Sequence, residues 1–251
     1  IGELTSFGIK LEEEIAAQQL NITDAQKNLL NPVIIETRKN WLRKSWGVWQ
    51  ILPNDYLKIE KANHLISVFH YGPLHPFVLS EMLDKLTDDY YNIYSIPDEF
   101  NLADFLFGIK GLSGARDDFY NPLNSNLVYV LKEKRGIPIS LASVYMLVGH
   151  RLGLRIEGCN YPSHFLIRFY SEGQMIFVDC YNGGKFIYEE DLIAMEKKNY
   201  FQNEKYFTEY VDANTIMTRT LNNLSNAYRQ NNESELSSFF STLLNETPQK
   251  I

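Results

Sequence analysis

The sequence predicts an α+β fold in which a buried central helix packs on a small antiparallel sheet, with helical flanks at both ends. Residues 139–152 are apolar on nearly every side of a helix, which indicates burial all round. Strand-like runs follow at 154–158, 164–170 and 175–180. We therefore expect a mainly helical region at 1–110, the core at 111–190 and C-terminal helices at 191–251.

The composition argues against two classes of binding partner. The chain has 251 residues, 45% of them hydrophobic, which is enough for a sizeable core in one or two domains. Its 24 basic and 31 acidic residues give a formal net charge of -7. An acidic chain binds nucleic acid and anionic membrane surfaces poorly, so we expect neither as a partner.

The densest basic patch lies between Arg38 and Lys44, beside Trp41 and Trp46. Basic residues interleaved with tryptophan can stack on nucleic acid. On an acidic chain we favour the other interpretation, an amphipathic helix anchored by its tryptophan rings.

The two cysteines, Cys159 and Cys180, are interpreted as reduced thiols of a cytoplasmic protein, because one disulfide would not support a secreted domain of this size. No signal peptide opens the chain, and no uncharged stretch is long enough to span a bilayer. The first residue is Ile1 rather than Met, which is consistent with a native stretch before it.

The N-terminal region is predicted to be mostly helical. Thr23 is expected to cap a helix that runs through Leu30 and is broken by Pro32. A helical pattern resumes at Val33 and continues through Trp46. Further helices are expected at about 55–69, 76–86 and 103–109, the first of them capped by Asp55 and ended by Gly72-Pro73.

Two helices are expected in the middle of the chain. Asn124 or Ser125 caps the first, which stops at Gly136. Pro138 opens the second as a first-turn proline, and Gly153 follows its end, where helices favour a left-handed residue.

A hairpin joins the second and third strands. Glu172-Gly173 forms its turn, so residues whose numbers sum to 345 face each other. Asp179 is thereby opposite Leu166, on the same sheet face as His164 and one diagonal step away, roughly 7–8 Å at the backbone. The segment Asn182-Gly183-Gly184 is expected to end the sheet.

The chain is expected to be helical again past Tyr188. Two apolar stripes support this prediction: Leu221, Leu224 and Tyr228, and then Leu236, Phe239, Phe240 and Leu243.

Pairing of His164 with Asp179 has a chemical consequence. An aspartate that accepts one imidazole N–H fixes the tautomer and raises the basicity of the other ring nitrogen. This supplies two thirds of a nucleophile–base–orienter triad. The third member is expected at the start of the buried helix, where the helix dipole stabilises a thiolate, but Pro138 stands there.

This arrangement resembles the transglutaminase-like superfamily. Its members carry a Gly-x-Cys-x-x-x-Ala helix start, then a strand that opens on His and a strand with Asp. Gly136 and Ala142 match the first motif and align Pro138 with the cysteine. His164 and Asp179 match the other two positions.

Several segments are also similar to the bacterial SirB-type subgroup, and together they cover about residues 56–245. They are 120–125, 135–141, 161–165, 181–184 and 218–224. The resemblance implies a papain-like core wrapped by helices, often followed by tetratricopeptide-like helices. Because the chain ends at Ile251, we expect that tail to be short or absent. The resemblance implies no settled activity, and a proline in place of the cysteine is typical of the subgroup.

The preferred hypothesis is a non-catalytic domain that needs no cofactor. It would use the former active-site cleft, rimmed by Tyr161, His164 and Asp179, to bind a peptide or regulatory protein. Pro138 would lie in that cleft in place of the nucleophile. Binding residues would include Asn124 and Ser125, which hold the loop over the cleft or serve only as helix caps.

The alternative is an active cysteine-type hydrolase or transferase with His164 as base, Asp179 as orienter and Cys159 as a relocated nucleophile. A cysteine in a strand is more often a buried hydrophobe. Ser140 lies about 200° round the helix from the expected site and should bond the backbone instead. A third hypothesis is an inert core whose terminal helices carry the interaction.

The other histidines show no metal-ligand spacing: His64, His70, His75 and His150.

Overall fold

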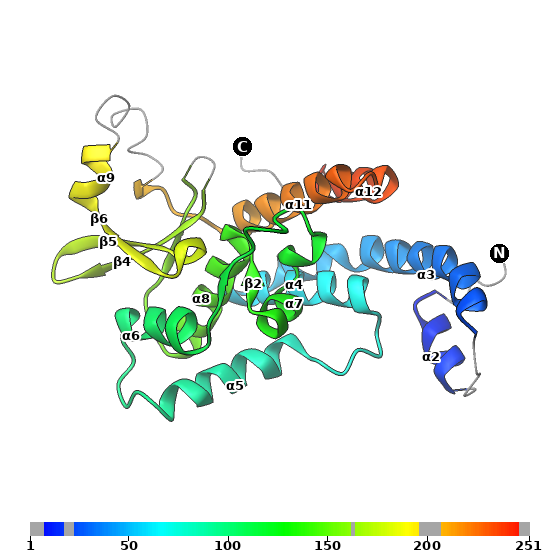
Figure 1. Ribbon diagram of the computed structural model, residues 1–251, viewed down its shortest axis with the longest axis horizontal. Coiled ribbons are helices and arrows are strands. Elements are labelled where there is room, and N and C mark those ends of the chain that lie inside the picture. The colour runs from blue at the N-terminus through cyan, green and yellow to red at the C-terminus, as the bar shows by residue number, and fades with distance from the viewer. Residues whose placement is uncertain (1–7, 18–22, 162–163, 196–206, 246–251) are drawn as a thin grey trace.

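The computed structural model describes residues 8–17, 23–161, 164–195 and 207–245. They form a mixed fold that is mostly helical, with one four-stranded sheet and a pair of very short strands (Figure 1). Figure 1 shows the sheet at one end of the molecule and helices α2 (Lys10–Ala17) and α3 (Asp24–Ser45) at the other, with α8 (Pro138–Arg151) between them. In the described ranges, none of the helices has both the length and the apolar character of a membrane span.

Helix α3 begins where the sequence predicts but does not break at the predicted position. The side chains and backbone N–H groups of Thr23 and Gln26 bond reciprocally in a capping box. The predicted break is wrong, because Pro32 lies inside the helix. A proline costs a helix interior about 3 kcal/mol. Burial of Val33 and Leu42 on the same helix offsets that cost.

The rest of the N-terminal region is helical as predicted, with shifted ends. Its elements are η1 (Trp46–Ile51), α4 (Asp55–Tyr71), α5 (Leu79–Tyr91), α6 (Glu99–Ala103) and the π-helical turn η2 (Asp104–Ile109). Asn54, rather than the predicted Asp55, caps α4, because its Oδ1 accepts the N–H of Leu57 at 2.9 Å. Gly72 follows the last residue of α4, with a φ of 85°.

A short helix and two short strands lead to the central helix. The helix α7 (Leu127–Glu133) follows the turn η3 (Pro122–Ser125), and the strands β1 (Ser113–Gly114) and β2 (Arg135–Gly136) pair in parallel. Asn126 caps α7, so the predicted caps Asn124 and Ser125 are one or two residues early. Lys134, with a φ of 58°, ends α7 before the predicted stop at Gly136.

Helix α8 is the buried central helix, and it packs against β3 and β4 of the sheet. Pro138 is its first residue, and Gly153 follows its end with a φ of 76°. Ser140 Oγ donates to the carbonyl of Ile137 and accepts the N–H of the same residue, both at 3.0 Å. Ser140 therefore closes the first turn of the helix, as the sequence predicts for its hydroxyl.

The sheet has the order β3 (Glu157–Cys159), β4 (Leu166–Ser171), β5 (Gln174–Asp179) and β6 (Lys185–Tyr188), all antiparallel. The predicted hairpin register is confirmed, since Ile167 pairs with Val178. Glu172 and Gly173 form the turn with φ values of 51° and 82°. The predicted end of the sheet after β5 is wrong. The turn η4 (Cys180–Asn182) and two left-handed glycines reverse the chain into β6 instead.

The chain ends in α9 (Glu189–Met195) and the helical hairpin of α11 (Ala213–Gln230) and α12 (Ser234–Asn245). Both predicted apolar stripes face inward here, with Leu236 the one member that is only partly buried. The main apolar cluster runs from Leu42 on α3 to Leu243 on α12 and includes most of α8. The division of the chain at residues 110 and 190 stays a prediction.

Candidate functional site

The end of β5 and the residues before β4 bring His164 and Asp179 together. His164 Nε2 lies 2.8 Å from Asp179 Oδ1, and the two side chains are 25% and 10% exposed. The confirmed register explains the contact, because Asp179 ends β5 opposite Leu166, two residues after His164. Pro162 and Ser163, which belong to the motif around His164, lie outside the described residues.

Asp179 is held as a carboxylate acceptor. Its Oδ1 accepts the backbone N–H of Asn182 at 3.1 Å, and its Oδ2 accepts the Asn182 side-chain amide at 2.7 Å. Burial alone would raise the pKa of Asp179, but the hydrogen bonds from His164 and Asn182 outweigh it and lower the pKa below its ordinary value. An ionised Asp179 needs a donor at His164 Nε2, so the neutral ring carries its proton there.

The other imidazole nitrogen is left as an acceptor. In the part of the chain that the structure describes, His164 Nδ1 has no hydrogen-bond partner. The side chain is a quarter exposed. Nδ1 can therefore accept a hydrogen bond from a ligand N–H or O–H, or take a proton from a nucleophile placed beside it.

Tyr181 forms one wall of this site. Its ring lies edge-on to His164, with centroids 6.3 Å apart, and the Arg116 guanidinium lies 5.8 Å from the Tyr181 ring centroid. Arg116 Nη2 also donates to Asn182 Oδ1 at 2.7 Å, which orients the amide that holds Asp179. No sequence motif marked Arg116, because its role depends on contacts across 66 residues of chain.

The same tyrosine connects the histidine to the start of α8. The Tyr181 hydroxyl donates to the carbonyl of Ala115 at 3.3 Å, and the Ala115 N–H donates to the carbonyl of Gly136 at 2.9 Å. Gly136 lies two residues before Pro138, which is partly exposed. A chain of contacts thus joins His164 to the helix start where the triad nucleophile is expected.

Gly114→Ala should disturb this wall. A Cβ at Gly114 would lie 2.6 Å from the carbonyl oxygen of Tyr181 and 2.7 Å from its ring. Because one of these atoms is backbone, we expect a loss of about 1–3 kcal/mol in the free energy of unfolding, measured with urea. Gly47→Ala is the control, since its Cβ would meet no atom within 4 Å. Equal stability of both variants would contradict the close packing of Tyr181.

Asn124 and Ser125 are both buried, in η3. The Asn124 side-chain amide donates to the carbonyl of Asp118 at 2.5 Å. The next residue, Phe119, packs edge-on against Tyr181 with ring centroids 6.1 Å apart. Asn124 therefore supports the loop that backs the wall of the site.

Cys159 belongs to a second, smaller apolar cluster, and Tyr161 packs against that cluster. Tyr161 packs on Phe207, and its carbonyl accepts Arg219 Nη1 at 3.2 Å. Cys159 is fully buried in this cluster with Met175. Burial raises the pKa of the Cys159 thiol to about 12.

Cys180, like Cys159, is a buried free thiol. Burial also raises the pKa of Cys180 well above its ordinary value. Among the described residues, no three His, Cys, Asp or Glu side chains are grouped to hold a metal ion.

Comparisons with known proteins place the chain in a family. The model of the transglutaminase-like superfamily matches residues 79–222, more than half of the chain. A UPF0162 protein of Xylella fastidiosa (strain 9a5c) is 31% identical over 134 residues, which are 51% of this chain and 48% of that protein. The chain thus spans about half the length of this relative.

Shorter matches extend to other organisms. A UPF0162 protein of Vibrio cholerae is 34% identical over 74 residues, 29% of this chain and 27% of that protein. F-box only protein 21 of Mus musculus is 40% identical over 80 residues, 29% of this chain and 13% of that protein. No solved structure matches the chain. The match over residues 79–222 shows that the chain belongs to the transglutaminase-like superfamily.

Proposed function

We propose that this protein is a transglutaminase-like member of the SirB-type subgroup that binds a peptide segment of a regulatory partner and does not cleave it. The observation that carries the proposal is the combination of an ordered His164–Asp179 pair with Pro138 at the start of α8. A base and its orienter without a thiol retain a hydrogen-bonding surface and lack the attacking group. The proposal includes a papain-like placement of α8 against the sheet.

The free acceptor nitrogen of His164 supports the proposal of peptide recognition. Its Nδ1 is an acceptor at a partly exposed position, and a backbone N–H of an extended peptide is a suitable donor. Tyr181 supplies aromatic surface beside His164, which suits peptide side chains. The two buried, reduced cysteines support a cytoplasmic location.

The experiment selects peptides from a random phage-displayed library on the wild-type protein and measures their affinity by fluorescence anisotropy. His164→Ala should weaken the selected peptides at least about tenfold, which corresponds to about 1.4 kcal/mol. His75→Ala is the matched control, because His75 is partly exposed like His164 and lies between α4 and α5. Unchanged affinity in His164→Ala would overturn the proposed binding site. Amide hydrolysis or crosslinking that is lost in His164→Ala would overturn the non-catalytic assignment.

The cysteine-type hydrolase is distinguished by thiol labelling. With a pKa of about 12, Cys159 has roughly one thiolate in 10⁵ molecules at pH 7, against about 3% for an ordinary thiol. We therefore expect iodoacetamide to alkylate native Cys159 very slowly, as followed by peptide mass spectrometry. Rapid labelling of this residue near neutral pH would instead favour the hydrolase.

A further inference from the structure

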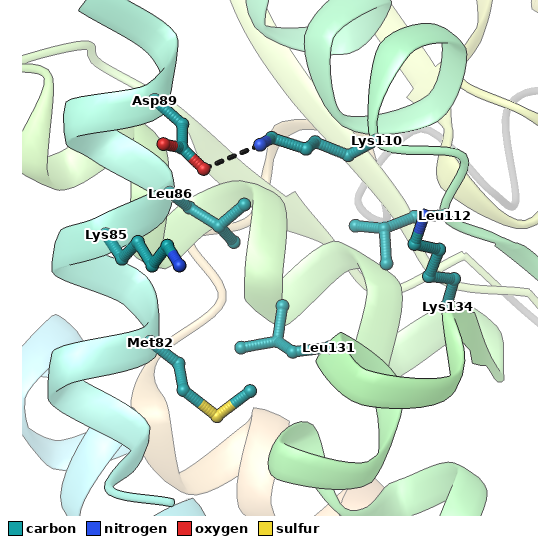
Figure 2. Close-up of a pocket in the computed structure, with 8 residues that line it drawn as sticks. All are labelled: Met82, Lys85, Leu86, Asp89, Lys110, Leu112, Leu131 and Lys134. Carbon is teal, nitrogen blue, oxygen red and sulfur yellow. Dashed lines mark hydrogen bonds and ion pairs between the residues drawn. The ribbon is translucent and has the colours of Figure 1, made fainter.

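A pocket lies apart from the residues around His164, between α5, the segment after η2 and the end of α7. Its volume is about 220 Å³. Figure 2 shows its lining, which consists of Met82, Lys85, Leu86, Asp89, Lys110, Leu112, Leu131 and Lys134. Four of these side chains are apolar and come from both sides of the pocket, and the other four are charged.

The charged rim is cationic on an acidic protein. It holds three lysines and one aspartate, whereas the whole chain has a net charge of -7. Asp89 forms an ion pair with Lys110, because its Oδ2 lies 2.6 Å from Lys110 Nζ. Neither Lys85 nor Lys134 forms an ion pair with another described residue. The exposed ammonium groups of Lys85 and Lys134 therefore lie beside apolar side chains and are not paired with a carboxylate of the described residues.

The backbone at Lys134 adds an independent observation. Lys134 has a φ of 58°, a left-handed conformation that glycine or asparagine adopts more easily at a helix end. Its carbonyl accepts the N–H of Ser113 at 3.0 Å, which holds this conformation against β1. A side chain other than glycine or asparagine at a strained position points to a use for that side chain. Here the use is a cation at the pocket rim.

We propose that this pocket binds a small amphipathic monocarboxylate. The carboxylate pairs with Lys85 and Lys134, and a short apolar chain covers Met82, Leu86 and Leu131. The volume is below the roughly 300–1,000 Å³ of pockets for drug-sized ligands, so it suits a smaller ligand. A bare inorganic anion would leave the apolar lining facing water, whereas an aliphatic acid satisfies both parts of the pocket.

Isothermal titration of the whole chain with octanoate tests the proposal. We expect one octanoate per chain, and at least tenfold weaker binding of octanol and of inorganic phosphate. The double variant Lys85→Gln, Lys134→Asn should weaken octanoate at least tenfold. Glutamine is a good helix former and asparagine tolerates the left-handed conformation, so both changes are compatible with the fold. Lys44→Gln, an exposed lysine outside the lining, should bind octanoate as the wild type does.

Three results would overturn the proposal. The first is the absence of octanoate binding at millimolar concentration. The second is an unchanged affinity in the double variant, with circular dichroism showing that it is folded. The third is equal affinity for octanoate and octanol, which would remove the role of the carboxylate.

Discussion

Pro138→Cys should create a reactive thiol at the start of α8. Pro138 is the first residue of that helix and is partly exposed. A helix N-terminus near a histidine lowers a thiol pKa from about 8.5 into the range of about 3.5–7.5. At pH 6 the larger thiolate fraction outweighs the lower nucleophilicity, so we expect iodoacetamide to react about tenfold faster than with an ordinary exposed thiol.

The two native cysteines should interfere little with this labelling experiment. Burial raises the pKa of both Cys159 and Cys180, so their labelling contributes little. Ser238→Cys, on the exposed side of α12, supplies the ordinary thiol for comparison. His164→Ala added to Pro138→Cys should lower the rate towards that of Ser238→Cys, because only the helix N-terminus then still favours the thiolate. If Pro138→Cys reacts no faster than the control, Pro138 does not occupy the nucleophile position.

His70 should make the protein lose stability steeply in acid. Its ring lies between the buried residues Asn126 and Tyr228, with Nδ1 3.0 Å from Asn126 Nδ2 and Nε2 3.0 Å from the Tyr228 hydroxyl. Asn126 Oδ1 already accepts from Ser67 and from Val128, so its amide nitrogen must donate to Nδ1. Protonating His70 would break this contact and leave a buried charge.

The pH range follows from the two pKa values. Burial, and then the charge of Arg38, lower the pKa of His70 from 6.5 to about 3 in the folded protein. Between these values the unfolded chain binds a proton that the folded chain excludes. The contribution of neutral His70 to the free energy of unfolding is therefore fully present above pH 6.5 and falls as the pH decreases towards 3. Below pH 3 the free energy of unfolding has lost the whole of this contribution, about 5 kcal/mol.

Urea unfolding between pH 7 and pH 4 measures this slope. His70→Gln should flatten it, and should cost about 1–3 kcal/mol at pH 7 because one buried partner loses its hydrogen bond. His75→Gln, at a partly exposed position between α4 and α5, should keep the wild-type slope. Parallel curves for His70→Gln and the wild type would show that another group controls the acid response.

Local patterns in the sequence predicted much of the fold. The apolar run of α8, the first-turn Pro138 and the turn at Glu172-Gly173 all specify structure through neighbours only a few residues away. The same reasoning was wrong at Pro32, where burial of other side chains on α3 outweighs a local preference. It also missed β6, because four residues after two glycines become a strand only by pairing with β5.

The sequence alone determined the register that brings His164 and Asp179 together and the proline at the start of the central helix, since strand alternation and a two-residue turn leave one pairing. Only the tertiary structure decided what surrounds the pair. The bridge from Tyr181 through Ala115 to Gly136 joins distant segments. The high pKa of Cys159 comes from burial, which depends on how the whole chain packs and not on the neighbours of a residue in sequence.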